Sequence, residues 1–145
     1  MKIFVINGPN LNLLGIRNLE VYGLETLDQL TVWLKNTTLG KEHDLKFFQS
    51  NHEGEIIDAI HGSIQWANGI LINPGALTHY SYSIRDAIEA ISIPCVEIHL
   101  SNIYNREIFR KKSVIKSVCI HQVIGKGKIS YLEGLNLLIN HIIKD

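Results

Sequence analysis

Two short runs that are apolar almost throughout, Lys2–Ile6 and Gly69–Asn73, constrain the fold more than any other feature. A strand with one face in water alternates apolar and polar residues. A parallel strand covered by helices on both faces is instead apolar nearly without interruption. The two runs therefore predict central strands of a parallel sheet. Further strand-like runs occur at about 45–49, 94–99 and 117–123.

Helical patterns separate the strand-like runs. Apolar residues recur at three- and four-residue spacing at about 26–39, 53–66, 78–91 and 130–143. Alternating strands and helices form a parallel sheet with helices on both faces, and right-handed crossovers leave few strand orders. We expect a three-layer α/β, flavodoxin-like fold with five strands in the order 2-1-3-4-5, built as one domain over residues 1–145.

The composition excludes several classes of function. The chain has 145 residues and is 46% hydrophobic, which suffices for a substantial core. Fourteen basic residues balance fourteen acidic ones, so the basic footprint of a nucleic-acid binder is missing. No run approaches the ~18 apolar residues of a membrane helix, and no charged-then-apolar leader precedes the first strand. We expect a cytoplasmic protein that binds neither nucleic acid nor membrane.

Metal and nucleotide sites are not indicated. No two histidines are spaced i, i+4, and Cys95 and Cys119 lie in separate apolar runs, where buried free thiols are expected. The segment from Gly8 to Gly15 has no lysine, and 125–128 lacks the hydroxyl that closes a phosphate-binding loop. We therefore expect no metal and no bound nucleotide.

Polar clusters follow the predicted strands at their carboxyl ends, where open α/β sheets bind ligands. The clusters are Asn7–Asn12, Ser50–His52, Asn73–Gly75, His99–Asn102 and Gly125–Gly127. Glu97 and His99 are two residues apart on one strand, so their side chains share a face. A carboxylate beside an imidazole orients the ring and favours its protonated form. The clusters predict a small-molecule site, and the pair predicts a proton donor in it.

Segment 8–25 is long for a connection between a strand and a helix, which suggests a mobile lid over this edge of the sheet. It carries Arg17 and Tyr22 between Gly15 and Gly23. A free tyrosine, with a pKa of about 10, is a negligible base at neutral pH. A guanidinium held beside the phenol in a desolvated site lowers that value by roughly 1–3 units. We therefore predict a tyrosinate base under a closed lid.

An ordered series of motifs extends these observations over most of the chain. They are Asn7–Gly15, Arg17, Tyr22–Gly23, Phe48–Gly54, Ile72–Ala76, Thr78–His79, Arg85–Ala87, Ile93–Pro94, Val96–Asn102, Arg106–Glu107 and Phe109–Arg110. In this order they resemble the type II 3-dehydroquinate dehydratases. The resemblance implies a flavodoxin-like subunit that converts 3-dehydroquinate into 3-dehydroshikimate, a step of the shikimate pathway. It also implies anti elimination through an enolate, no metal or cofactor, and trimers that assemble into a homododecamer.

The resemblance assigns roles to matching residues. Tyr22 would be the base at C2, with Arg17 activating it and closing the lid. His99, oriented by Glu97, would protonate the departing C1 hydroxyl, and Asn10 would help to stabilise the enolate. The residues expected to hold substrate are Asn73, His79, Ser101, Arg110 and the backbone of Leu100, with Asp86 contributed by a neighbouring subunit.

Two other functions remain open from the sequence alone. A non-catalytic sensor of an anionic metabolite would keep Asn73, His79 and Arg110 but would need neither Arg17 nor Tyr22. A flavin or nucleotide carrier of the same fold would give a coloured or absorbing purified protein.

Overall fold

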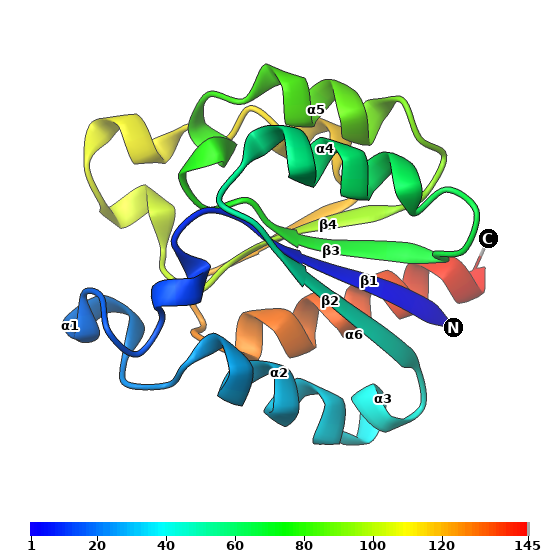
Figure 1. The fold of residues 1–145 in the computed structure, drawn as a ribbon, viewed down its shortest axis with the longest axis horizontal. Coiled ribbons are helices and arrows are strands. Elements are labelled where there is room, and N and C mark those ends of the chain that lie inside the picture. The colour runs from blue at the N-terminus through cyan, green and yellow to red at the C-terminus, as the bar shows by residue number, and fades with distance from the viewer. Residues whose placement is uncertain (145) are drawn as a thin grey trace.

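The computed structural model describes residues 1–144, which form a five-stranded sheet between two layers of helices (Figure 1). The strands are β1 (Lys2–Asn7), β2 (Asp44–Gln49), β3 (Gly69–Asn73), β4 (Cys95–His99) and β5 (His121–Ile124). Their order is β2-β1-β3-β4-β5, and every neighbouring pair is parallel. The predicted three-layer α/β fold and its strand order are confirmed. The predicted domain, 1–145, ends on a residue outside the described part.

Helices α4 and α5 cover one face of the sheet, and α2 and α6 cover the other (Figure 1). The α-helices are α1 (Leu19–Tyr22), α2 (Leu27–Asn36), α3 (Thr38–Lys41), α4 (Glu53–Gly62), α5 (Tyr82–Glu89) and α6 (Ile129–Lys144). The 3-10 turns are η1 (Leu11–Leu13), η2 (Gly75–His79), η3 (Ile103–Asn105), η4 (Ile108–Lys111) and η5 (Lys116–Val118). None of the helices within residues 1–144 is both long and apolar enough to cross a membrane.

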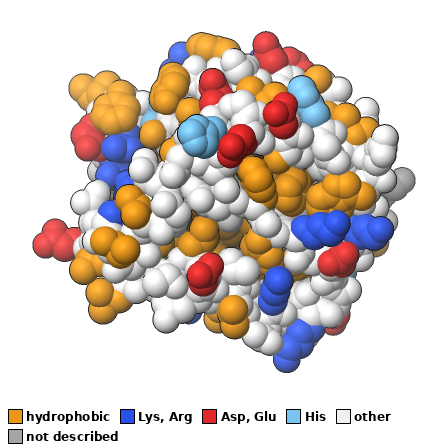
Figure 2. Space-filling view, viewed as in Figure 1, with side chains coloured by type: hydrophobic (Ala, Val, Ile, Leu, Met, Phe, Trp, Pro, Cys, Tyr) orange, Lys and Arg blue, Asp and Glu red, His pale blue; other side chains and the backbone are white. Residues whose placement is uncertain are grey.

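Strand β1 shows why its run is apolar from Ile3 to Ile6. Ile3 and Val5 belong to the core cluster that includes residues of α2 and α6. Phe4 and Ile6 belong to the opposite cluster, which includes residues of α4 and α5. Successive side chains of a strand point to opposite faces, and here helices cover both of them. Acidic and basic side chains are interspersed on the outer surface seen in Figure 2, in keeping with a formal net charge of zero.

Capping side chains decide where two of the helices begin. Thr26 and Gln29 form a capping box at the start of α2, each side chain bonding the other's backbone N–H. At α5 the Ser81 hydroxyl accepts from the N–H of Ile84 at 3.0 Å. The predicted start of that helix at residue 78 is therefore wrong, since 75–79 forms the separate turn η2.

The last predicted strand, 117–123, is wrong in its first half. Residues Lys116–Val118 form η5, and β5 begins at His121. Its neighbour β4 begins only at Cys95, and the preceding Pro94 has no N–H with which to extend the ladder. The Cys95 thiol is buried as expected, whereas Cys119 is only partly buried; both are free.

Candidate active site

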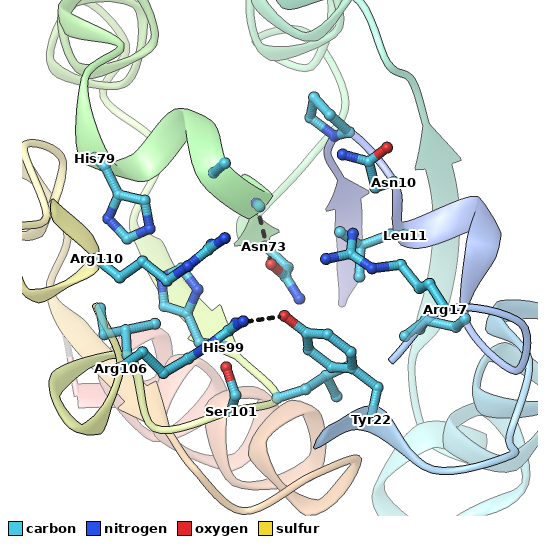
Figure 3. Close-up of a pocket in the computed structure, with 16 residues that line it drawn as sticks. Asn10, Leu11, Arg17, Tyr22, Asn73, His79, His99, Ser101, Arg106 and Arg110 are labelled. Atoms are coloured by element: carbon cyan, nitrogen blue, oxygen red, sulfur yellow. Dashed lines mark hydrogen bonds between the residues drawn. The ribbon is translucent and has the colours of Figure 1, made fainter. Parts of the chain in front are cut away.

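A cavity of about 110 Å³ opens where β1, β3 and β4 end (Figure 3). That volume has room for several water-sized groups, and hence for a small organic molecule. The predicted site residues that line it are Asn10, Arg17, Tyr22, Asn73, His79, His99, Leu100, Ser101 and Arg110. From the predicted set, Glu97 and Asp86 lie outside the lining.

The polar clusters after the two outer strands do not line this cavity. Ser50–His52 follows β2 and Gly125–Gly127 follows β5, and both strands lie at the edges of the sheet. The first cluster still supports the site, because the backbone N–H of Asn10 donates to Asn51 Oδ1 at 2.9 Å. The cavity therefore forms beyond three of the five strands.

The turn after β1 depends on a glycine. The N–H of Gly8 donates to the carbonyl of Asn73 at 2.7 Å, which draws the ends of β1 and β3 together. A Cβ on Gly8 would lie 2.5 Å from the carbonyl oxygen of Pro74, closer than non-bonded atoms come. Asn10 follows with φ 68, a left-handed conformation that asparagine adopts more readily than most residues. This turn delivers the Asn10 side chain to the cavity.

Tyr22 reaches the cavity from the last residue of α1, inside the long segment predicted to be a lid. Its hydroxyl accepts a hydrogen bond from Arg106 Nη1 at 2.7 Å (Figure 3). Arg17 approaches from the other side, with its guanidinium carbon 5.0 Å from the centre of the Tyr22 ring. Two guanidinium groups therefore face one phenol.

Arg106 lines the cavity and bonds Tyr22, but the sequence assigned it no role. It stood in a recognised motif but received no role, because 84 positions separate it from Tyr22. No local spacing brings such residues together. The sequence assigned the activating role to Arg17, yet in this structure Arg106 makes the hydrogen bond to the phenolic oxygen and Arg17 stacks on the ring.

Glu97 and His99 form the pair expected from their spacing on β4. His99 Nε2 donates to Glu97 Oε1 at 2.7 Å, and the carboxylate is fully buried. Nδ1 is then the ring nitrogen available to the cavity that His99 lines. Burial alone would raise the pKa of Glu97, but the hydrogen bond and charge of His99, aided by the Thr78 and Ser113 hydroxyls, lower it overall. Glu97 is therefore a carboxylate at neutral pH.

His79 is held with a defined ring orientation at the cavity wall. Its Nδ1–H donates to the carbonyl of Lys112 at 2.7 Å, and Phe109 packs edge-on against the ring. Burial lowers the pKa of His79, and this outweighs the bond to Lys112, which acts in the opposite direction. The neutral ring therefore leaves Nε2 as an acceptor suited to a ligand hydroxyl.

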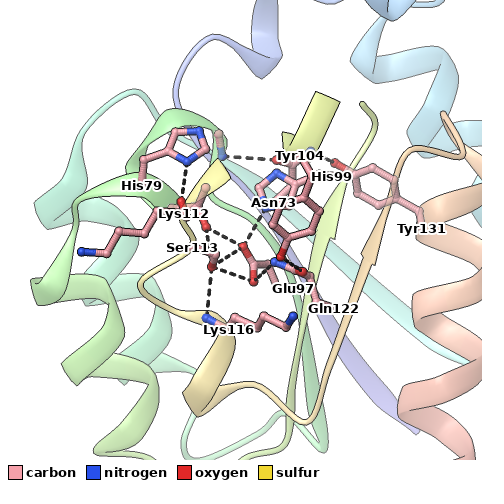
Figure 4. Close-up of polar contacts among 12 residues, drawn as sticks. Asn73, His79, Glu97, His99, Tyr104, Lys112, Ser113, Lys116, Gln122 and Tyr131 are labelled. Carbon is pink, nitrogen blue, oxygen red and sulfur yellow. Dashed lines mark hydrogen bonds and ion pairs between the residues drawn. The ribbon is translucent and has the colours of Figure 1, made fainter. Parts of the chain in front are cut away.

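Asn73 is fixed by a buried tyrosine behind it (Figure 4). Asn73 Nδ2 donates to the Tyr131 hydroxyl at 3.0 Å, and that hydroxyl donates to Asn7 Oδ1 at 2.6 Å. Burial raises the pKa of Tyr131 far above the ordinary value for a tyrosine, so it remains a phenol. Asn73 Oδ1 also accepts from the N–H of Gly75 at 3.2 Å. The amide therefore has one orientation.

The cavity is positively charged. Arg17, Arg106 and Arg110 line it, and none of the described lining residues is acidic. Arg110 donates to the exposed Glu107 at 2.9 Å, and its planar fork suits a carboxylate ligand. The site thus favours a small anion.

Asp86 lies elsewhere, on α5, with 73% of its side chain exposed and a 3.0 Å ion pair to Arg85. Its predicted role in a neighbouring subunit stays a prediction. No group of three or more His, Cys, Asp or Glu side chains within residues 1–144 is arranged to hold a metal ion.

The chemistry available is that of paired acid and base. The Tyr22 phenol, beside two guanidinium groups, and the His99 imidazole border the same small cavity (Figure 3), and the Glu97 carboxylate holds the imidazole from outside the lining. Amide and guanidinium donors surround the remaining volume. Such a site can remove a proton at one carbon, stabilise charge on an oxygen and protonate a leaving group.

Comparison with known proteins agrees with this chemistry. The sequence pattern of the family described as dehydroquinase class II matches residues 1–139. The chain is 53% identical over 138 residues to a 3-dehydroquinate dehydratase from Caldicellulosiruptor saccharolyticus, covering 94% of this chain and 95% of that protein. It is also 53% identical over 145 residues to one from Clostridium perfringens, covering 98% of each. The crystal structure of a type II dehydroquinase from Butyrivibrio crossotus superposes with a TM-score of 0.93 at 46% identity, covering 96% of this chain and 97% of that one.

Proposed function

Because the chain belongs to the class II dehydroquinase family, we propose that it removes water from 3-dehydroquinate with Tyr22 as the base and His99 as the acid. The activity is that of a hydro-lyase, and its product is 3-dehydroshikimate, an intermediate of the shikimate pathway. The observation that carries the two roles is the presence at one cavity of Tyr22, bonded to Arg106, and of His99, bonded to Glu97.

The first step is proton removal. The guanidinium groups of Arg106 and Arg17 stabilise the Tyr22 phenolate, which takes a proton from C2 of the substrate. The electrons of the broken C–H bond move into the enolate, whose oxygen becomes negatively charged. Asn10 lies on the cavity wall and supplies an amide donor for that charge.

The second step is loss of the hydroxyl group. The enolate collapses to form the C1–C2 double bond and breaks the C1–O bond. Protonated His99 delivers its proton from Nδ1 to the departing oxygen, which leaves as water. The Glu97 carboxylate accepts the hydrogen bond from Nε2 and so leaves Nδ1 to face the departing oxygen.

Substrate binding falls to the other lining residues. Arg110 offers a fork for the substrate carboxylate, and neutral His79 offers an acceptor for a hydroxyl. Asn73, Ser101 and the backbone of Leu100 complete the polar wall.

We also propose that the protein acts in the cytoplasm as a homododecamer of trimers. The resemblance assigns Asp86 to the site of a neighbouring subunit, and its side chain is exposed and absent from the lining of its own cavity. Light scattering of the pure protein tests the assembly, and a monomeric mass would contradict it.

The activity is tested by adding 3-dehydroquinate to the pure protein and following the absorbance of the enone product. Turnover that is indifferent to EDTA is expected, and absence of turnover would contradict the proposal. The sensor alternative is not supported, since the matching relatives are dehydratases and the Tyr22 arrangement has no purpose in a sensor. Calorimetry that shows tight binding without conversion would restore it.

A further inference from the structure

The Glu97 carboxylate has hydrogen-bond partners other than His99, and one of them, Gln122, lies outside the cavity lining (Figure 4). Thr78 and His99 donate to Oε1, and Ser113 Oγ lies 2.9 Å and 3.0 Å from the two carboxylate oxygens. The remaining donor to Oε2 is Gln122 Nε2, at 2.8 Å. Gln122 does not line the cavity, and its hydrogen bond to the acid pair is the one to the carboxylate.

The position of Gln122 follows from the sheet register. Glu97 on β4 pairs with Gln122 on β5, so the two side chains lie next to each other on the same face. A carboxylate only accepts hydrogen bonds, so the amide must turn its NH₂ group toward Glu97. Its oxygen then faces away and accepts from the Tyr104 hydroxyl at 2.9 Å. Tyr104 is 37% exposed, so this chain of bonds runs from the buried carboxylate to the surface.

We infer that Gln122 and Tyr104 are positioning residues for the acid pair (Glu97 and His99): Gln122 donates to the carboxylate, and Tyr104 holds the Gln122 amide in the donating orientation. The inference rests on the proposed function, in which His99 is the acid. Tyr104 lies in η3, on the same connection as Arg106, so the bond also ties that connection to β5.

The physical effect concerns how tightly the acid pair holds its proton. Each donor to a carboxylate stabilises its charged form. Removal of the Gln122 donor raises the affinity of the coupled pair for protons, and the pair titrates at higher pH. His99 then becomes a weaker acid toward the departing oxygen. Turnover falls while substrate affinity is retained, because neither positioning residue contacts the cavity.

Other ionisable groups lie near the acid pair, and their titrations must be distinguished from that of the pair. They are His79 on η2, Cys95 on β4, Arg110 on η4 and Lys116 on η5. Among the hydrogen bonds described in residues 1–144, none joins Gln122 directly to these four residues; the backbone N–H of Lys116 donates to Ser113 Oγ, which also bonds Glu97. A titration resolved by residue therefore separates the acid pair from them.

The test is the pH dependence of Gln122→Met, which keeps the length of the side chain but removes the amide. We expect the basic limb of the kcat profile to move up by about one pH unit and KM to change less than twofold. The His99 ring signal in a ¹³C-histidine NMR titration, assigned with His99→Gln, moves in the same direction. Tyr104→Phe, at an exposed position, produces a smaller shift of the same sign.

Non-additivity is the sharpest readout. The double variant Tyr104→Phe/Gln122→Met matches Gln122→Met alone, because Tyr104 acts only through the amide. The exposed Gln65→Met and Tyr82→Phe are controls that leave both readouts at their wild-type values. A His99 titration unchanged in Gln122→Met, or fully additive shifts, would overturn the inference. The NMR titration needs no turnover, so it decides the inference even if the pure protein proves inactive and the proposed function fails.

Discussion

Replacing Arg106 with methionine removes the guanidinium that donates to the Tyr22 hydroxyl at 2.7 Å. The side chain of Arg106 is 17% exposed, so solvent replaces little of the lost contact. Arg17 remains stacked on the ring, 5.0 Å from its centre, and keeps part of the positive field. The variant therefore isolates the contribution of one charge-assisted hydrogen bond to the phenolate.

The size of the effect follows from that bond. A hydrogen bond to a charged group contributes about 1.5–3 kcal/mol. At about 1.4 kcal/mol for each factor of ten, kcat at neutral pH falls by roughly 10- to 100-fold. The difference in kcat between Arg106→Met and the wild type becomes smaller as pH rises. At high pH Tyr22 loses its proton even without the guanidinium of Arg106. The kcat of Arg106→Lys falls less than that of Arg106→Met, because lysine keeps the positive charge. It still falls below the wild-type value, because lysine lacks the planar fork of the guanidinium.

The assay is the kcat profile between pH 6 and about 10, with thermal melting to verify the fold. Lys35→Met is the control, since it removes a surface cation that lies over Phe47, outside the cavity lining. A kcat of Arg106→Met equal to that of the wild type, or a deficit of the same size at every pH, would refute the reasoning.

The remaining predictions concern stability and the site's support. The pKa of Glu97 is lowered on folding, so its stabilising effect is complete above its ordinary value of 4.5 and is lost as pH falls through the folded value. Wild-type Tm should therefore drop more steeply than that of Glu97→Gln in acid melting scans. Tyr131→Phe leaves the Asn73 amide without its hydrogen-bond acceptor, so we expect the free energy of unfolding in urea to fall by about 1–3 kcal/mol and KM to rise. An unchanged free energy and KM would contradict this. Gly8→Ala clashes with the Pro74 carbonyl and destabilises by about 1–3 kcal/mol, so equal unfolding midpoints would count against that contact.

The sheet could be predicted because its signal is local. Residues Ile3–Ile6 and Gly69–Asn73 are buried on both faces, and the composition of the two runs alone distinguishes them from half-exposed strands. Boundaries were less predictable, because they depend on partners elsewhere in the chain. β5 begins at His121 because its neighbour β4 begins at Cys95. The residues 117–123 alone do not indicate where β4 begins.

The same distinction applies to the site. Glu97 and His99 were paired from their spacing, since a strand places alternate side chains together. Arg106 reaches Tyr22 only in the folded chain, where a distant connection meets segment 8–25. The clusters after β2 and β5 were expected at the site, but outer strands end too far from the cavity to line it.

The account depends most on the phenol of Tyr22 as the group that takes the proton from the substrate. Turnover of 3-dehydroquinate by Tyr22→Phe, measured beside the wild type at equal Tm, tests this directly. We predict that kcat falls by several orders of magnitude, because phenylalanine offers no oxygen to accept the proton. A variant that keeps more than about a tenth of wild-type turnover would contradict the account.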